Sequence, residues 1–129
     1  MTEIDVKTAS RIAMVEITER VAAVVAASGV REGIVVVHVP HTTAGVTLNE
    51  NADPDVAADL IAALDRMVPR RGPYRHAEGN SDAHIKSALI GHSVTLPVVE
   101  GRMALGAWQG LFFCEFDGPR SRRVRITVQ

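Results

Sequence analysis

Hydrophobic and polar positions repeat with two periods along the chain, and the period separates predicted strands from predicted helices. In 124–128, apolar residues alternate with arginine and threonine, which is typical of a strand with one buried face. Segments 3–8 and 11–16 look like short strands joined by a turn. The run IVVVHV at 34–39 is continuously β-branched and predicts a strand covered on both faces, with 45–48 returning as its hairpin partner.

Three segments carry helical signals. The first is expected to start at Thr18 as N-cap and to end at about residue 28, because Gly29 suits the position beyond a helix end. The second starts at Asp53, a capping residue followed by a proline at the first helical position. The third covers roughly 81–90, with Asn80 or Ser81 as its N-cap.

The last third of the chain is β in character. Segments 94–99 and 103–116 flank Glu100-Gly101, a two-residue hairpin signal, and a turn is expected at 117–119. Strands at both ends of the chain around two or three helices predict an α+β fold. We expect largely antiparallel sheets packed with those helices in one compact domain spanning residues 1–129.

Composition narrows the function classes. The chain is 47% hydrophobic with a net charge of −1, which argues against nucleic acid or a membrane surface as partner. No signal peptide and no apolar run of membrane-spanning length is visible, so a cytoplasmic location is expected. The lone Cys114 lies in the apolar run LFFCEF and is expected to be a buried small hydrophobe.

Three histidines lie at predicted strand ends or helix starts. His41 follows Pro40, His76 lies in a loop, and His84 is in the first turn of the third helix. Neutral imidazoles are common ligands of Zn²⁺, and three of them with an open position would form a catalytic metal site. The alternative is that each is an ordinary solvated or hydrogen-bonded side chain. His38 and His92 are assigned to the core or an interface and to the surface, respectively.

Other polar residues have both structural and functional interpretations. Glu50 is either a metal ligand or general base, or a polar loop residue. Asn80 either caps a helix or lies at a phosphate site at that helix start. The turn from Asp117 to Arg120 places a guanidinium beside a carboxylate, and arginine suits phosphate oxygens. Trp108-Gln109 is either core or a stacking platform. These residues predict an anion-binding pocket, with a bound metal ion left open.

Several segments resemble one family from about residue 18 to the end. They are HTTAGVTLNENADPDVAADL, YRHAEGNSDAHIKSALIG and LPVVEGRMALGAWQGLFFCEFDGPRSRRV, and they resemble the YjbQ-like secondary thiamine-phosphate synthases. The resemblance implies a compact α+β homotrimer with pockets near subunit boundaries. It also implies a transferase that joins hydroxymethylpyrimidine pyrophosphate to thiazole phosphate, with a divalent ion (Mg²⁺ or Zn²⁺).

Residue roles follow from the same resemblance. The metal ligands would be His41, His76 and His84, and the catalytic residues Glu50, Asp117 and Arg120. Substrate would contact Asn80, Trp108, Gln109 and Arg120. Two other classes remain open: a non-catalytic trimer that binds a metal ion or phosphorylated metabolite, and a metal-dependent phosphohydrolase. The expected partner is a small phosphorylated metabolite.

Overall fold

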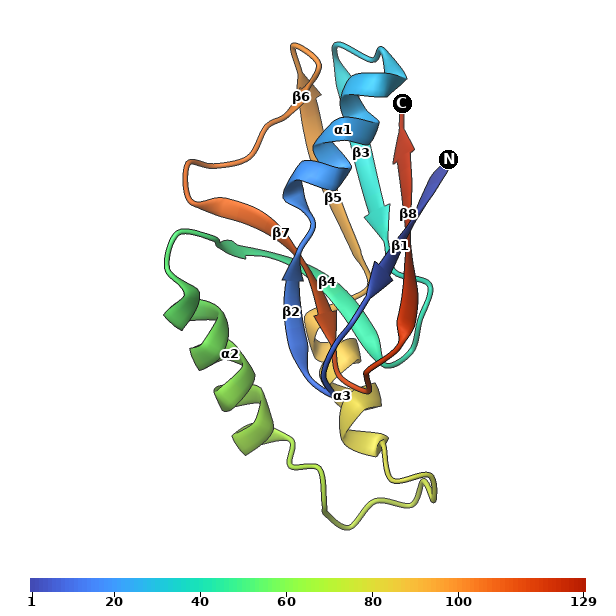
Figure 1. Cartoon of the computed structure of the whole chain (residues 1–129), viewed down its shortest axis with the longest axis vertical. Helices are drawn as coiled ribbons and strands as arrows, with labels where there is room; N and C mark the ends of the chain where they lie inside the picture. Colours follow the sequence, from blue (N-terminus) through green and yellow to red (C-terminus); the bar gives the residue numbers. More distant parts are fainter.

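Eight strands and three helices make up the computed structural model, which describes residues 1–129 (Figure 1). The strands are β1 (Thr2–Lys7), β2 (Ala13–Glu16), β3 (Gly33–His38), β4 (Ala44–Glu50), β5 (Ser93–Val99), β6 (Arg102–Met103), β7 (Gln109–Glu115) and β8 (Ser121–Val128). The helices are α1 (Thr18–Ser28), α2 (Pro54–Met67) and α3 (Ser81–Ile90). One antiparallel sheet has the order β1-β8-β3-β5-β6 and the other has the order β2-β7-β4. The predicted α+β fold with antiparallel sheets is therefore confirmed.

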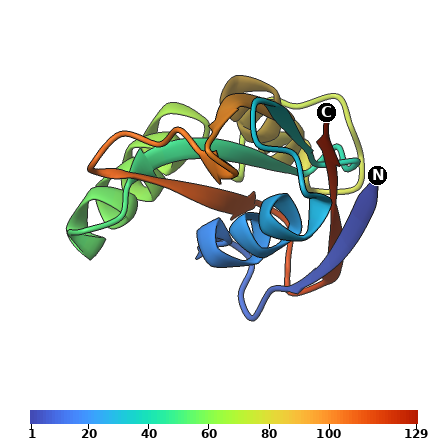
Figure 2. The same ribbon diagram turned by 90° about the horizontal axis from the view of Figure 1, so that it is seen from above.

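The central strand of the smaller sheet, β7, is buried on both faces. Leu111 and Phe113 belong to the main core, which also receives Val21 and Val25 of α1. The alternate residues Phe112 and Cys114 pack in a second cluster with side chains from α2 and α3. Helix α1 and helix α3 accordingly lie on opposite sides of β7 (Figure 2). Burial raises the pKa of Cys114 to about 12, so its thiol behaves as the small hydrophobe that was predicted.

The β-branched strand β3 has only one buried face, which corrects the prediction from its sequence. Val35 and Val37 are fully buried, whereas Ile34 is 38% exposed. A continuous apolar run does not show which residues face solvent, because an apolar side chain can remain exposed at an acceptable cost. The two-sided burial predicted for β3 is found in β7 instead.

One predicted strand pairing is also wrong: β3 and β4 lie in different sheets, so they do not form a hairpin. β1 and β2, predicted as strands joined by a turn, also lie in different sheets. The long strand predicted over 103–116 is divided into β6 and β7, again in different sheets. The hairpin at Glu100-Gly101 is confirmed: both residues have positive φ, and Val99 pairs with Arg102. Local turn signals identified this hairpin, whereas they do not show when a chain changes sheets.

The helix starts were predicted with mixed success. Asp53 caps α2, because its carboxylate accepts a hydrogen bond from the backbone N–H of Asp55 at 2.9 Å. Thr18 is not a cap: Ile17 occupies that position, and the Thr18 hydroxyl accepts from the backbone N–H of Leu111 instead. Asn80 is at the cap position of α3, but its side chain makes no capping bond. None of the three helices is both long and apolar enough to cross a membrane.

Candidate functional site

Three crossings between the two sheets lie together at one end of the molecule. They are residues 8–12 between β1 and β2, 39–43 between β3 and β4, and 116–120 between β7 and β8. Backbone hydrogen bonds join them, from Thr8 to Arg120 at 2.9 Å and from Phe116 to Thr43 at 3.1 Å. The third crossing approaches the first closely, since a side chain at Gly118 would meet the carbonyl oxygen of Ser10 at 2.4 Å.

A polar cavity of about 380 Å³ opens beside these crossings, and we call it the His41 cavity. The start of α3 and the loop before it complete its wall. Its lining residues are Pro40, His41, Thr42, Thr43, Glu78, Asn80, His84, Arg120 and Arg122. Four of the residues predicted to form the site, namely His41, Asn80, His84 and Arg120, therefore lie in one cavity.

A buried ion pair supports this cavity. Glu115 is fully buried, and its carboxylate accepts hydrogen bonds from Nε and Nη2 of Arg122 and from the hydroxyl of Thr8. Burial alone would raise the pKa of Glu115, but these hydrogen bonds outweigh it, and the pKa lies below its ordinary value. Arg122 also donates to the Thr43 hydroxyl at 2.8 Å, which fixes the crossing that carries His41.

The imidazole of His41 is held in one orientation. Its Nε2 accepts the backbone N–H of Arg123 at 3.0 Å, so the proton of the neutral ring is on Nδ1. Burial lowers the pKa of His41, and the nearby Arg122 lowers it further. At neutral pH His41 is consequently an uncharged ring with an N–H group available for donation.

Arg120, Asp117 and Asn80 form a small network at the cavity wall. Arg120 donates from Nη2 to the Asp117 carboxylate at 2.8 Å and from Nε to the Asp117 carbonyl, while its Nη1 makes no bond within the chain. Asn80 donates to the same carboxylate at 2.9 Å, which explains why it does not cap α3. The Oδ1 of Asn80 is buried without a partner. Prediction of a carboxylate and a guanidinium side by side at this turn is confirmed.

The start of α3 remains without a side-chain cap as a result. The first backbone bonds in this turn are those of Ala83 and His84, both to the carbonyl of Asn80. The backbone N–H groups of Ser81 and Asp82 donate to no atom of the chain. Free amides at the positive end of a helix attract anions. Asp82 is fully buried, so this helix start offers one accessible donor, the backbone N–H of Ser81.

The histidines predicted to bind a metal are not arranged as a metal centre. His76 and His84 are neighbours, with ring centroids 5.4 Å apart in an edge-to-face arrangement. His41 shares the His41 cavity with His84, and its Nε2 already accepts a hydrogen bond. If Nδ1 bound a metal, the proton would have to move to Nε2 and this bond would be lost. No group of three histidine, cysteine, aspartate or glutamate side chains is placed to hold a metal ion. The residues as placed do not fit a divalent cation.

Glu50, Trp108 and Gln109 lie elsewhere, at what we call the Glu50 end. Glu50 pairs with Gln109 at one end of the β4–β7 ladder, whereas Ala44 pairs with Glu115 at the other. A strand of this length separates its ends by about 20 Å. Trp108 is 65% exposed, so it is not the core residue that one interpretation expected. Within one chain these three residues cannot share a ligand with His41.

Two features of the site were missed by sequence reasoning. Neither Arg122 nor Glu115 was assigned a role in the site. Both could have been found from their positions, because Arg122 is in phase with the buried Val124 and Ile126, and Glu115 interrupts an apolar run. A charge at a buried position requires a partner of opposite sign.

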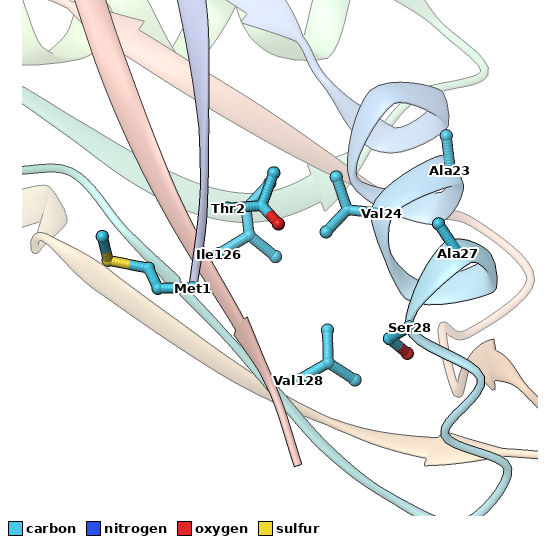
Figure 3. A pocket seen from close by; sticks show the side chains of 8 residues that line it. All are labelled: Met1, Thr2, Ala23, Val24, Ala27, Ser28, Ile126 and Val128. Atoms are coloured by element: carbon cyan, nitrogen blue, oxygen red, sulfur yellow. The ribbon is translucent and has the colours of Figure 1, made fainter.

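A second kind of hollow contrasts with the His41 cavity. It is a groove of about 350 Å³ between α1 and the β1–β8 edge (Figure 3). Val24, Ile126 and Val128 are among its lining residues, and it contains no ionisable side chain. Its lining is mostly apolar, and Met1 there carries the α-amino group of the chain. The His41 cavity, in contrast, has no hydrophobic lining residue.

The fold and the cavity define an α+β protein of two antiparallel sheets with a polar pocket at their junction. The chain belongs to the YjbQ-like UPF0047 family, whose model matches residues 2–129. It is 49% identical to a UPF0047 protein of Methanocaldococcus jannaschii over 95% of this chain and 89% of the other. It is 47% identical to YugU, a UPF0047 protein of Bacillus subtilis, over 97% and 96% of the two chains.

Solved structures agree with the fold. A crystal structure of a YjbQ/UPF0047 protein from Clostridium acetobutylicum matches all of both chains with a TM-score of 0.98 and 47% identity. A YbjQ-like protein of unknown function from Sulfolobus solfataricus matches with a TM-score of 0.95 and 30% identity, over 98% of this chain and 94% of that one. The family resemblance noted in the sequence is confirmed.

The activity expected from that resemblance is corrected by the same comparisons. The relatives are described only as UPF0047 or YjbQ-like proteins, and none of these descriptions contains a thiamine-phosphate synthase. Assigning the chain that transferase reaction was therefore wrong. Residue positions agree with this correction in part, because Glu50, Trp108 and Gln109 do not reach the cavity that contains Arg120.

Proposed function

We propose that the His41 cavity binds the phosphate group of a small phosphorylated metabolite. The observation that carries the proposal is a polar cavity in which hydrogen-bond donors from three segments meet. Arg120 supplies a guanidinium with a free Nη1, and His41 supplies its Nδ1–H. The uncapped start of α3 supplies the backbone N–H of Ser81. Phosphate oxygens accept from each of these donor types.

The size of the cavity favours a small ligand. A volume of about 380 Å³ is at the lower end of what small-molecule pockets offer. The cavity has no apolar wall, so the part of the ligand bound there is polar. Support for an anion comes from the two arginines of the lining, against one carboxylate, that of Glu78. Arg122 is committed to Glu115, so Arg120 is the arginine we expect to contact the ligand.

Titration calorimetry with phenyl phosphate tests this proposal. Wild-type protein is expected to bind it, and Arg120→Gln to bind it about tenfold more weakly, because a charged hydrogen-bond donor is lost. Arg125→Gln is the matched control: Arg125 is also exposed and paired with a carboxylate, that of Glu3, but it is outside the cavity. Its affinity should equal that of wild type.

Two results would contradict the proposal. The first is absence of phenyl phosphate binding at millimolar concentration to a folded wild-type protein. The second is equal loss of affinity in Arg120→Gln and Arg125→Gln, because that would indicate general electrostatic attraction. Phenyl sulfate, which carries one negative charge, provides a further comparison: it should bind more weakly than phosphate dianion at pH 7.5.

We also propose that the chain assembles as a homotrimer. Support comes from large apolar side chains exposed in the single chain: Met67, Leu89 and Trp108 are each more than half exposed. Such side chains are often covered by a partner. Sedimentation equilibrium at micromolar concentration should give three times the chain mass of 13.9 kDa. A mass equal to that of one chain would contradict this.

A cytoplasmic location is the third proposal. It is supported by the single free thiol of Cys114, which has no disulfide partner in the chain. Cell fractionation followed by immunodetection should find the protein with cytoplasmic markers. Recovery with the medium or with membranes would contradict it.

A further inference from the structure

A second cavity, of about 420 Å³, lies beside the loop that joins α2 to α3, and we call it the arginine cavity. Residues of segment 77–80 divide between it and the His41 cavity. Ala77 and Gly79 line the arginine cavity, whereas Glu78 and Asn80 line the His41 cavity. Alternate residues of this segment therefore face different cavities, and the segment forms a wall between the two.

The arginine cavity contains guanidinium groups without partners. Arg70 and Arg71 line it, and neither makes a hydrogen bond or ion pair in the chain. Arg120, Arg122, Arg123 and Arg125, in contrast, each bond to a carboxylate. An unpaired arginine can offer its planar fork to an anionic ligand without breaking an existing bond.

The loop that carries these arginines has a defined structure. The Tyr74 hydroxyl donates to the carbonyl of Pro69, and the backbone N–H of Tyr74 donates to that of Gly72 at 2.8 Å. A side chain at Gly72 would touch the Tyr74 ring, at 3.2 Å. The segment from Pro69 to Gly72 is thus closed on the tyrosine, and Arg70 and Arg71 lie within that closed segment.

A third hollow, of about 270 Å³, shares lining residues with each of the two cavities. It shares His84 with the His41 cavity, and Tyr74 and His76 with the arginine cavity. Its remaining lining residues are Arg75, Ser81 and Ile85, of which Ile85 is 40% exposed. The edge-to-face pair of His76 and His84 stands at this junction. Rings and an aliphatic side chain suit a planar or cyclic group of a ligand.

We propose that the ligand of the His41 cavity carries a second anionic group, which binds Arg70 and Arg71, and a cyclic core that lies between them against Tyr74, His76 and His84. The proposal rests on the function proposed above and extends it to the class of ligand. One anion lies near Arg120 and the α3 start, and the other lies beyond the histidine pair. Ala77 and Gly79 are small, which leaves room in the arginine cavity. Glu78 lines the His41 cavity instead.

The test compares two probes that differ by one phosphate: phenyl phosphate and 1,4-phenylene bisphosphate. Wild type is expected to bind the bisphosphate at least about tenfold more tightly, because a second charged contact is added. Arg70→Gln/Arg71→Gln should remove this advantage and leave phenyl phosphate affinity unchanged. Arg20→Gln/Arg31→Gln is the control for net charge, since these unpaired arginines lie outside all three hollows of the site. It should behave as wild type with both probes.

The outcomes separate this inference from the function on which it rests. If phenyl phosphate binds, is weakened by Arg120→Gln, and the bisphosphate binds no more tightly, the second anion site is wrong and the proposed function stands. If both double variants lose the same affinity for the bisphosphate, the gain is general electrostatics and the arginine site is wrong. If neither probe binds, both proposals fail.

Discussion

The two ends of the β4–β7 ladder carry similar residue types but hold their charges differently. At one end Glu115 is fully buried and accepts hydrogen bonds from Arg122 and Thr8. At the other end Glu50 is half-buried, and its carboxylate makes no hydrogen bond in the chain. The first end is built from three sheet crossings that bond to one another, and the second ends in the exposed Trp108 loop.

The difference shows that a polar site is preorganised where buried charged groups have fixed partners. Buried ionic groups are retained only where partners satisfy them, and their fixed partners then hold neighbouring groups in place. His41 and Arg120 are held in position in this way, because the crossings that carry them are hydrogen-bonded to Arg122 and Thr8. The Glu50 end has no comparable network within one chain.

The largest expected effect on stability comes from removing the buried negative charge of Glu115. Glu115→Gln keeps the shape of the side chain but leaves the buried Arg122 guanidinium without a counter-charge, so we expect a loss of about 3–5 kcal/mol in the free energy of unfolding. Glu50→Gln, the same chemical change at the other end, should alter it by no more than about 0.5 kcal/mol. Urea denaturation followed by circular dichroism measures both. Equal effects would remove the distinction between the two ends.

The next effect concerns Arg120, which bonds to Asp117 through Nε and Nη2 but leaves Nη1 free. Arg120→Lys keeps the charge but loses the planar fork, so it should recover part of the roughly tenfold loss of phenyl phosphate affinity expected for Arg120→Gln. Trp108→Ala, at the Glu50 end, should leave this affinity unchanged. Calorimetry on the three variants checks the order. Full recovery by lysine would show that a point charge suffices, and the geometric role of Arg120 would be wrong.

A smaller effect concerns pH. Since burial lowers the pKa of His41 in the folded chain, the unfolded chain binds more protons below the ordinary value of about 6.5. The stability contributed by neutral His41 is therefore present above about pH 6.5 and is lost as pH falls towards its folded pKa. His41→Gln should flatten the stability curve in this window. A curve for His41→Gln that is as steep as that of wild type would contradict the assignment.

A separate acidic window belongs to the carboxylates. Burial would raise the pKa values of Glu115 and Asp82, but hydrogen bonds from Arg122 in one case and from Arg11 and Lys86 in the other lower them on balance. Their contribution is present above the ordinary carboxyl range of about pH 4 and is lost as pH falls further. In the Glu115→Gln variant, stability should depend less on pH in this window than in wild type. An unchanged slope would show that Glu115 is not the titrating group.

The smallest effect concerns Cys114. Its thiol is buried and its pKa is about 12, so almost no thiolate forms at pH 8. Iodoacetamide should leave the native chain unmodified over hours and modify it promptly in urea, as measured by mass spectrometry. Rapid modification of the native chain would mean that the cluster under α2 and α3 opens readily.

Much of the fold could be predicted from the sequence, because local signals specify local structure. The Asp53-Pro54 start of α2 and the Glu100-Gly101 hairpin follow from the conformational preferences of those residues. What could not be predicted is which strands share a sheet. The crossings at 8–12 and 39–43 look like ordinary turns in the sequence, yet each carries the chain from one sheet to the other.

The candidate site was predicted in part for the same reason. Of the residues predicted to form a site, His41, Asn80, His84 and Arg120 line one cavity. Glu50 was expected at the end of the strand that forms a hairpin with the strand leading to His41. β3 and β4 lie in different sheets, and β4 carries Glu50 to the far end of its ladder with β7. The sequence does not show this change of sheet.

The central claim is that the anion site lies at the sheet crossings and excludes the Glu50 end. The most direct test is a titration of ¹⁵N-labelled protein with phenyl phosphate, followed by backbone amide chemical shifts. We expect the largest shifts at His41, Ser81, Asp82 and Arg120, and none at Glu50 or Gln109. Shifts centred on Glu50, Trp108 and Gln109, with the amides of Ser81 and Asp82 unmoved, would contradict the account.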